Sequence, residues 1–295
     1  MPNLKELKNK IDSVRSTRKI TQAMKMVAAS KLRRAQDTAE AARPYSEKMA
    51  KIMSSLSNSM EDSESSPDLL LGKKDNKTHL ILAVTSDRGL CGGFNSSIVK
   101  AVKNKVLELE KDNIKFKIIC IGRKGFDVLK GLYEENVIMN SNISVKNGYE
   151  LSEQIGKEVI LRFEKDEYGS CSIIYNKFKS AISQIVSEQS IIPCLISDES
   201  EDDKENDNSL GINFEFEPDE SEILADLLPK NISVQIYKAI LESGAGEQGA
   251  RMAAMDNATR NAGEMIDKLN LSYNRQRQAI ITGELIEIIA GAEAL

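Results

Sequence analysis

The two ends of the chain constrain its fold most, because both predict unusually long helices. Apolar residues recur at helical spacing from the start of the chain to about Tyr45, and again from about Pro229 to Leu295. A helix of roughly 65 residues is about 100 Å long, which exceeds what a small domain can bury. We therefore expect the two terminal helices to pair with each other and to protrude from whatever lies between them.

Two prolines predict where these helices end or begin. Pro44 predicts a kink or an end of the first helix, because its ring removes a backbone hydrogen bond. Pro229 suits a first-turn position, so we expect a short helix over 219–228 and a long helix that starts near this proline. The first turns also carry a short heptad seam, formed by Leu4, Leu7, Ile11 and Val14.

The middle of the chain predicts an α/β domain. Five apolar runs read as strands, at 79–85, 115–121, 136–139, 170–178 and 190–196. Segments with helical spacing separate them, at 95–109, 123–132 and 149–163. This alternation is typical of βαβ units, which build a mostly parallel sheet with helices on both faces.

These patterns divide the chain into five segments. We expect an N-terminal coiled-coil helix over 1–56, a linker over 57–77, the α/β domain over 78–197, an acidic loop over 198–218 and a C-terminal coiled-coil helix over 219–295. The linker is Ser-rich and acidic, and the loop contains the charge run Asp198–Asp207, which favours a solvated segment.

Charge and composition narrow the class of protein. The net charge is −5, yet the first 36 residues hold ten basic and two acidic residues, which predicts an acidic partner for that end. The four cysteines show no paired spacing and read as buried apolar residues of a reducing compartment. No apolar run of about 18 residues and no signal peptide is visible, so we expect a chain that neither spans a membrane nor is secreted.

The sequence predicts no catalytic, cofactor-binding or metal-binding residue. Gly89–Asn95 follows a strand and precedes a helix, where a phosphate loop would lie, but it matches neither common phosphate-binding motif. His79 is the single histidine and has no recognisable triad, and no Cys or His pair has metal-ligand spacing. Glu284 and Glu287, one turn apart, are interpreted as surface carboxylates.

The C-terminal tip, residues 280–289, has the most distinctive local pattern of the chain. Its apolar residues cover most of the helix circumference, and they are Ile280, Ile281, Leu285, Ile288 and Ile289, with Ile286 beside them. A helix that is apolar nearly all round is buried, and one N-terminal helix cannot bury it alone. We expect other subunits to supply the missing surface.

Four stretches together resemble a known family over nearly the whole chain. The N-terminal Ile20–Leu32 (ITQAMKMVAASKL) and the C-terminal Tyr273–Leu285 (YNRQRQAIITGEL) are similar to the two signatures of the gamma subunit of the F-type ATP synthase, bacterial type. Arg251–Met255 (RMAAM) and Ser86–Asn95 (SDRGLCGGFN) match as well. The resemblance implies a Rossmann-like central domain and a long antiparallel, left-handed coiled coil formed by the N- and C-terminal helices.

The family resemblance also implies a function and partners. The chain would be the central stalk, or rotor shaft, that couples proton-driven rotation of the c-ring to ATP synthesis or hydrolysis at the alpha and beta subunits. Its partners would be the 3:3 hexamer of alpha and beta subunits, the epsilon subunit and the c-ring, with one copy per complex, no nucleic acid and only indirect contact with the membrane. It would have no catalytic site, nucleotide or cofactor of its own and would lie at the cytoplasmic face of the bacterial inner membrane.

Residue roles follow from the same resemblance. Met24 and Lys25 would face the beta subunits, and Arg277 and Gln278 would form a polar catch against beta-subunit loops. Thr282 and Glu284 would lie near Met24 in the helix pair and serve coupling, and the apolar tip would be a hydrophobic bearing.

Two other functions stay open on the residues alone. The strand, glycine turn and helix at 80–100 also fit a Rossmann-type nucleotide- or cofactor-binding enzyme with helical appendages. The basic N-terminal helix also fits a nucleic-acid-binding coil, which would be retained on DNA in a salt-dependent way.

Overall fold

The computed structural model describes residues 4–60, 68–73, 75–143, 148–180, 183–194 and 220–293. The chain divides into two compact units. The helical unit comprises Met1–Ser30 and Arg251–Leu295, and the sheet unit comprises Lys31–Ala250. The linker residues 61–67 and the predicted acidic loop, up to residue 219, lie outside the described residues.

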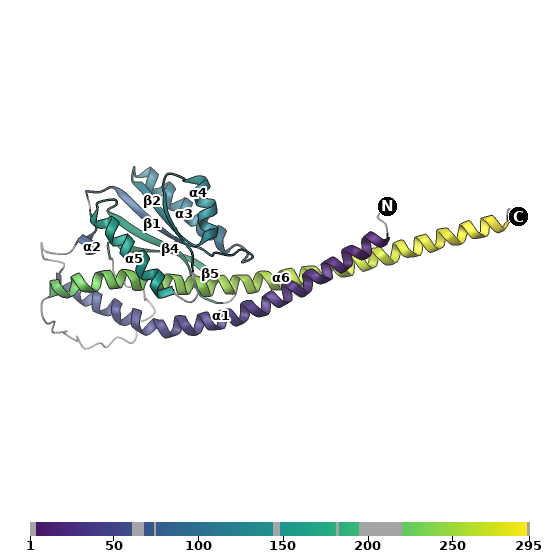
Figure 1. Ribbon diagram of the computed structural model, residues 1–295, viewed down its shortest axis with the longest axis horizontal. Coiled ribbons are helices and arrows are strands. Elements are labelled where there is room, and N and C mark those ends of the chain that lie inside the picture. Colours follow the sequence, from purple (N-terminus) through teal and green to yellow (C-terminus); the bar gives the residue numbers. More distant parts are fainter. Residues whose placement is uncertain are drawn as a thin grey trace. The chain divides into compact units, whose positions relative to one another are not determined.

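Two long helices contribute to both units. Helix α1 spans Leu4–Met60 and helix α6 spans Glu220–Glu293 (Figure 1). An end of the first helix at Pro44 and a helix boundary at Pro229 are wrong, because each proline lies inside a continuous helix.

Packing explains why these helices continue past their prolines. An interior proline costs about 3 kcal/mol through a lost hydrogen bond and a clash with the preceding turn. Met49 and Met53 of α1 are buried in one apolar cluster with Leu224 and Leu228 of α6. This cluster holds α1 beyond Pro44 and anchors α6 just before Pro229, so tertiary contacts override local propensity.

The sheet unit contains one five-stranded sheet in the order β3-β2-β1-β4-β5. The strands are β1 Thr78–Val84, β2 Lys115–Ile121, β3 Val137–Ser141, β4 Ser170–Phe178 and β5 Gln184–Ile192. Strands β3, β2, β1 and β4 are parallel, with Thr78 opposite Lys115 and His79 opposite Ser170. Strand β5 is longer than predicted and runs antiparallel to β4, because a short connection cannot cross over.

Helices cover both faces of this sheet, as the alternation of strands and helices predicts. They are α2 Asp68–Leu71, α3 Phe94–Lys111, α4 Arg123–Leu132 and α5 Gly148–Glu164. Odd-numbered β1 residues such as Ile81 pack with α3 and α4, whereas Leu80 and Leu82 pack with α5 and α6 (Figure 1). The two apolar clusters hold the sheet between its helices, so the predicted α/β fold with long terminal helices is confirmed.

All four cysteines are buried in the sheet unit and none forms a disulfide. Burial raises the pKa of Cys120 to about 12 and also raises the pKa of Cys171. Burial raises the pKa of Cys194 too, against hydrogen bonds from Gln235 and Asn231. The thiols therefore behave as apolar core residues.

Candidate functional site

The helical unit is an antiparallel pair of helices. Thr259 Oγ1 of α6 donates a hydrogen bond to Thr21 Oγ1 of α1 at 2.8 Å. One turn further along α1, Lys25 Nζ lies 2.6 Å from Asp256 Oδ1. Because the residue number rises on α1 while it falls on α6, the two helices run in opposite directions.

The buried residues of this unit follow a heptad pattern. On α1 they include Leu7, Ile11, Thr21 and Ala28, and on α6 they are Met255, Ala262 and Ile266. The intervals are four, seven and ten residues, and ten is the sum of a heptad and three, so one stripe of each helix stays turned to its partner. The predicted seam is therefore present, and Leu4 and Val14 lie half-buried at its margin.

A polar layer interrupts the apolar seam. Thr21 is buried with only 8% of its surface exposed, and Thr259 satisfies its hydroxyl. The hydrogen bond from Lys25, with a further contribution from its charge and that of Arg260, lowers the pKa of Asp256. The carboxylate of Asp256 thus forms ion pairs with Lys25 and, at 3.6 Å, with Arg260. Such a layer favours one register, because sliding either helix would leave polar groups without partners.

The sequence did not predict that Thr21, Asp256 and Thr259 form contacts between the two helices. Each is a polar residue in or beside a seam of apolar residues, which is the only signal that a single sequence offers. Recognising them as partners requires the register of the two helices, and that register joins residues more than 230 positions apart.

The register corrects one expectation about the helix pair. Met24 lies next to Lys25 and therefore beside the Asp256 region of α6, so its expected proximity to Thr282 and Glu284 is wrong. About 25 residues separate these positions along α6, or roughly 37 Å of helix. The paired residue numbers add to 280 or 281 and the described part of α1 begins at Leu4, so α6 beyond about residue 277 has no opposite residue there.

The remaining predicted site residues lie near the end of α6. Arg277, Gln278, Thr282 and Glu284 are all exposed. The polar catch and the apolar tip are consecutive on one helix, whereas Met24 is half-buried on α1.

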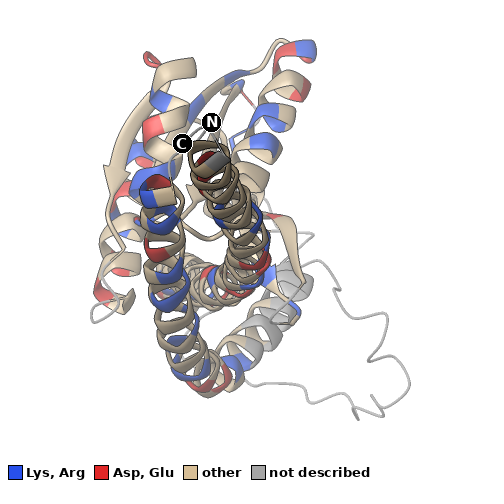
Figure 2. Ribbon diagram, turned by 90° about the vertical axis from the view of Figure 1, so that its right-hand side faces the viewer, with Lys and Arg blue, Asp and Glu red and all other residues tan. Residues whose placement is uncertain are grey.

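The apolar tip is exposed on all sides. The exposed fraction is 40% for Ile280 and 69% for Ile288, and the other large residues lie between these values: Ile281, Leu285, Ile286 and Ile289. Figure 2, which looks onto this end, shows the last turns of α6 mostly in the tan of uncharged residues. A contiguous apolar surface of this kind marks an interaction site.

The glycine turn at Gly89–Asn95 is closed by its own hydrogen bonds. Leu90 and Gly92 have positive φ angles of 64° and 58°. Asn95 Oδ1 accepts a hydrogen bond from the Ser86 backbone N–H at 3.0 Å, and its Nδ2 group reaches Cys91 Sγ at 3.3 Å. These contacts account for the turn as a strand-to-helix connection that orients α3.

His79 is a half-buried residue of strand β1 whose ring bonds to the neighbouring strand. Its two ring nitrogens lie 2.6 Å from Ser170 Oγ and 2.8 Å from Ser172 Oγ, both on the neighbouring strand β4. Burial lowers the pKa of His79 to about 4, aided by the charge of Lys105 and opposed by that of Glu188. Among the described residues, no group of three or more His, Cys, Asp or Glu side chains could hold a metal ion.

Among the described helices, none combines the length with the apolar character that a membrane crossing requires.

Known proteins match this chain over its whole length. The family model described as ATP synthase matches residues 3–295. The ATP synthase gamma chain of Pelagibacter ubique is 54% identical over 299 residues, and the match covers all of both chains. The ATP synthase gamma chain of Jannaschia sp. is 52% identical over 297 residues, again with full coverage of both.

Solved structures of rotary complexes share the fold. A chain from the central stalk and c-ring of the Tetrahymena thermophila mitochondrial ATP synthase superposes with a TM-score of 0.61 at 28% identity, covering 81% of this chain and 99% of that one. A chain from the Euglena gracilis mitochondrial ATP synthase rotor gives a TM-score of 0.67 at 19% identity, covering 94% and 98%. The arrangement of a five-stranded sheet between long terminal helices is thus a known one.

Proposed function

Because the chain belongs to the ATP synthase gamma-chain family, we propose that it is the central stalk of an F-type ATP synthase. In this role it couples proton-driven rotation of the c-ring to ATP synthesis or hydrolysis at the alpha and beta subunits. The full-length similarity to gamma chains at 50% identity and above supports this function, as does the shared fold of central-stalk chains.

One observation carries the proposal. The tip of α6 exposes six large apolar residues, and the described part of α1 does not reach them. Burial of apolar surface is worth roughly 25 cal/mol per Å², so a surrounding collar of other subunits is the favourable environment for this tip. The ring of alpha and beta subunits supplies such a collar, and Ile280, Ile281, Leu285, Ile288 and Ile289 then act as a hydrophobic bearing.

Below the bearing, we propose that side chains of both helices contact the beta subunits. Arg277 and Gln278 are exposed and free to meet beta-subunit loops, and Met24 and Lys25 would meet a second beta-subunit surface. Lys25 reaches Asp256 as well, so it would bring a partly neutralised charge to that contact. The role of Thr282 and Glu284 in coupling then rests on their place beside the catch and not on proximity to Met24.

Membership of this family also implies the other partners of the chain and its location. We propose one copy of the chain per complex, with the epsilon subunit and the c-ring as its other partners and no nucleic acid. The chain would have no catalytic site of its own and no bound nucleotide, which the closed glycine turn supports. It would be a peripheral protein at the cytoplasmic face of the bacterial inner membrane, attached through the c-ring.

Affinity purification tests the function directly. The full-length chain is used to retrieve its partners from mildly solubilised source membranes, and the eluate is assayed for ATPase activity. We expect two nucleotide-binding subunits in threefold molar excess each, with activity. Recovery of the chain alone, together with micromolar binding of ATP or NAD to it, would instead favour the nucleotide-binding enzyme.

The polar catch is tested separately in the assembled complex. Arg277→Ala combined with Gln278→Ala should reduce proton pumping per ATP hydrolysed, while thermal unfolding of the isolated chain stays unchanged because both residues are exposed. Asp267→Ala combined with Lys268→Ala, an exposed pair on the same helix, is the matched control. Equal coupling in both double variants would remove the catch from these two residues.

A further inference from the structure

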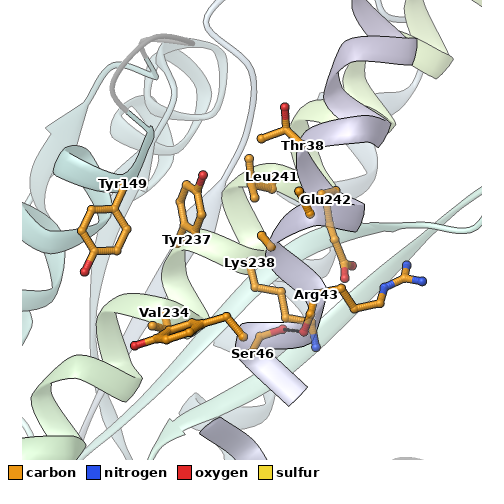
Figure 3. A pocket seen from close by; sticks show the side chains of 13 residues that line it. Thr38, Arg43, Ser46, Tyr149, Val234, Tyr237, Lys238, Leu241 and Glu242 are labelled. Atoms are coloured by element: carbon orange, nitrogen blue, oxygen red, sulfur yellow. Dashed lines mark hydrogen bonds between the residues drawn. The ribbon is translucent and has the colours of Figure 1, made fainter. Parts of the chain in front are cut away.

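The sheet unit contains a pocket whose role is independent of the proposed function. It has a volume of about 510 Å³ and lies where α1 and α6 meet the start of α5 (Figure 3). Its lining combines alanines and aliphatic residues with three tyrosines and three ionisable side chains. The tyrosines are Tyr45, Tyr149 and Tyr237, and the ionisable side chains are Arg43, Lys238 and Glu242.

The pocket exists because the α1 side of the helix pair changes to small residues. Ala39, Ala41 and Ala42 face the pocket from α1, opposite Val234 and Leu241 of α6. Buried residues resume on α1 at Met49 and Met53. Short side chains between two well-packed stretches leave space that neither helix fills.

Aromatic rings form a wall of this space. Tyr149 and Tyr237 pack edge to face, with ring centroids 5.6 Å apart and planes at 85°. Tyr45 and Tyr149 remain more than half exposed although both line the pocket. Apolar walls with a few hydroxyl groups and a volume of this order (~300–1,000 Å³) are typical of sites for small ligands.

The charges in the pocket indicate which ligand it favours. Within the part of the chain that the structure describes, neither the Arg43 guanidinium nor the Lys238 ammonium forms an ion pair or a side-chain hydrogen bond. Glu242 also lines the pocket and has contacts of its own. Two cations and one carboxylate leave a net charge of one positive unit, which a single anionic group would balance.

We propose that this pocket binds a single-chain amphiphile with one anionic head group, of the long-chain carboxylate class. The hydrocarbon chain lies along Ala42, Leu241 and the tyrosine rings, and the carboxylate accepts hydrogen bonds from Arg43 and Lys238. The pocket's volume and single net charge favour a small ligand of this class over a segment of another protein.

Isothermal titration of the full-length chain with laurate, below its critical micelle concentration, tests the proposal. We expect saturable binding at one site and about fourfold weaker binding for each methylene removed from the chain. Dodecan-1-ol, which lacks the charge, should bind roughly tenfold more weakly. Dodecyltrimethylammonium should not compete with laurate.

Two variants locate the site. Ala42→Trp fills the pocket and should abolish binding. Arg43→Gln with Lys238→Gln leaves the volume intact and should weaken laurate at least tenfold while leaving dodecan-1-ol unchanged. Lys230→Gln, the same change at an exposed residue of α6 outside the pocket, is the matched control.

The exposed apolar tip is the competing site for a hydrocarbon chain, so it needs its own control. Ile288→Ser with Ile289→Ser should leave laurate binding unchanged. The proposal fails if this tip variant loses binding, if Ala42→Trp folds and still binds, or if laurate gives no heat. A different result would assign the pocket to a protein partner instead. In that case an acidic amphipathic peptide displaces laurate, and the affinity for carboxylates does not depend on the length of their hydrocarbon chain.

Discussion

Lys25 illustrates how a residue read from the sequence as a surface contact is also a structural one. The excess of basic residues in the first 36 positions predicts an acidic partner, and for Lys25 the structure places one such partner within the chain. Asp256 accepts from Lys25 beside the buried Thr21–Thr259 hydrogen bond. The pair therefore favours this helix register within the chain itself, as a half-exposed supplement to the buried threonine contact.

Charge exchange tests this register. Lys25→Asp places two carboxylates side by side and should lower the melting temperature of the full chain. Adding Asp256→Lys should restore part of it, because opposite charges face each other again while the new ammonium is repelled by Arg260. The two single variants and the double variant form a thermodynamic cycle measured by thermal unfolding. Additive effects in that cycle would show that the two side chains do not interact.

His79 makes the stability of the sheet unit sensitive to acid. Burial lowers its pKa from 6.5 to about 4, so the folded chain keeps the ring neutral where the unfolded chain binds a proton. The unfolded state binds more protons between these two values, so the free energy of unfolding falls as the pH falls through that window.

We expect the free energy of unfolding to decrease by about 2 kcal/mol from this residue between pH 7 and pH 5. His79→Gln removes the titrating ring and should flatten that part of the pH profile. Denaturant unfolding of both proteins across the range measures the difference. The same slope in the variant would show that His79 does not cause the pH dependence.

At the scale of elements, close packing depends on a few glycines. Gly156 of α5 lies against α6, and a Cβ at this position would stand 2.5 Å from Ser233 Oγ. Gly244 of α6 has open space around the same atom. Two glycines in helices of the same unit thus have different reasons to be there.

Replacing these two glycines should have effects of opposite sign. Gly156→Ala forces the Ser233 hydroxyl out of its place beside α5 and should destabilise the chain by about 1–3 kcal/mol, and Ser233→Ala added to it should recover part of the loss. Gly244→Ala meets no neighbour and should stabilise by roughly 0.5–1 kcal/mol through helix propensity. Chemical unfolding measures both, and equal changes would contradict the packing argument.

Sequence patterns predicted most helices and strands. They failed where contacts between distant residues determine a helix end or a strand direction. The four parallel strands follow from apolar runs bounded by turns, and the long helices follow from their spacing. The continuation through Pro44 and Pro229 does not, because it depends on Met49 and Met53 meeting Leu224 and Leu228. The direction of β5 was likewise missed, since its short apolar run carries no sign of its partner's orientation.

For the candidate site, the sequence predicted the apolar tip but not the register beside it. All-round apolar character is a local property of residues 280–289 and needs no partner to be recognised. The facing positions of α1 and α6 depend on Thr259 and Asp256, which look like ordinary polar helix residues when read alone.

At the scale of the whole molecule, we expect the apolar tip to contribute to assembly of the complex and not to the folding of the isolated chain. Ile288→Ser with Ile289→Ser should leave the melting temperature of the isolated chain nearly unchanged, because both side chains are exposed. The same change should reduce the yield of assembled complex, since the collar would lose apolar contacts worth roughly 25 cal/mol per Å². Native gel electrophoresis of the reconstituted subunits measures that yield, and full assembly would place the bearing elsewhere.

The burial of every cysteine has a practical consequence for following this molecule in motion. All four thiols belong to the sheet unit, and burial raises the pKa values of Cys120, Cys171 and Cys194, so they resist maleimide reagents while the chain stays folded. A new cysteine on the exposed face of the helical unit, such as Asn274→Cys, would then be the one position that accepts a fluorescent dye. The chain can therefore be labelled for single-molecule observation without replacing any of its native cysteines.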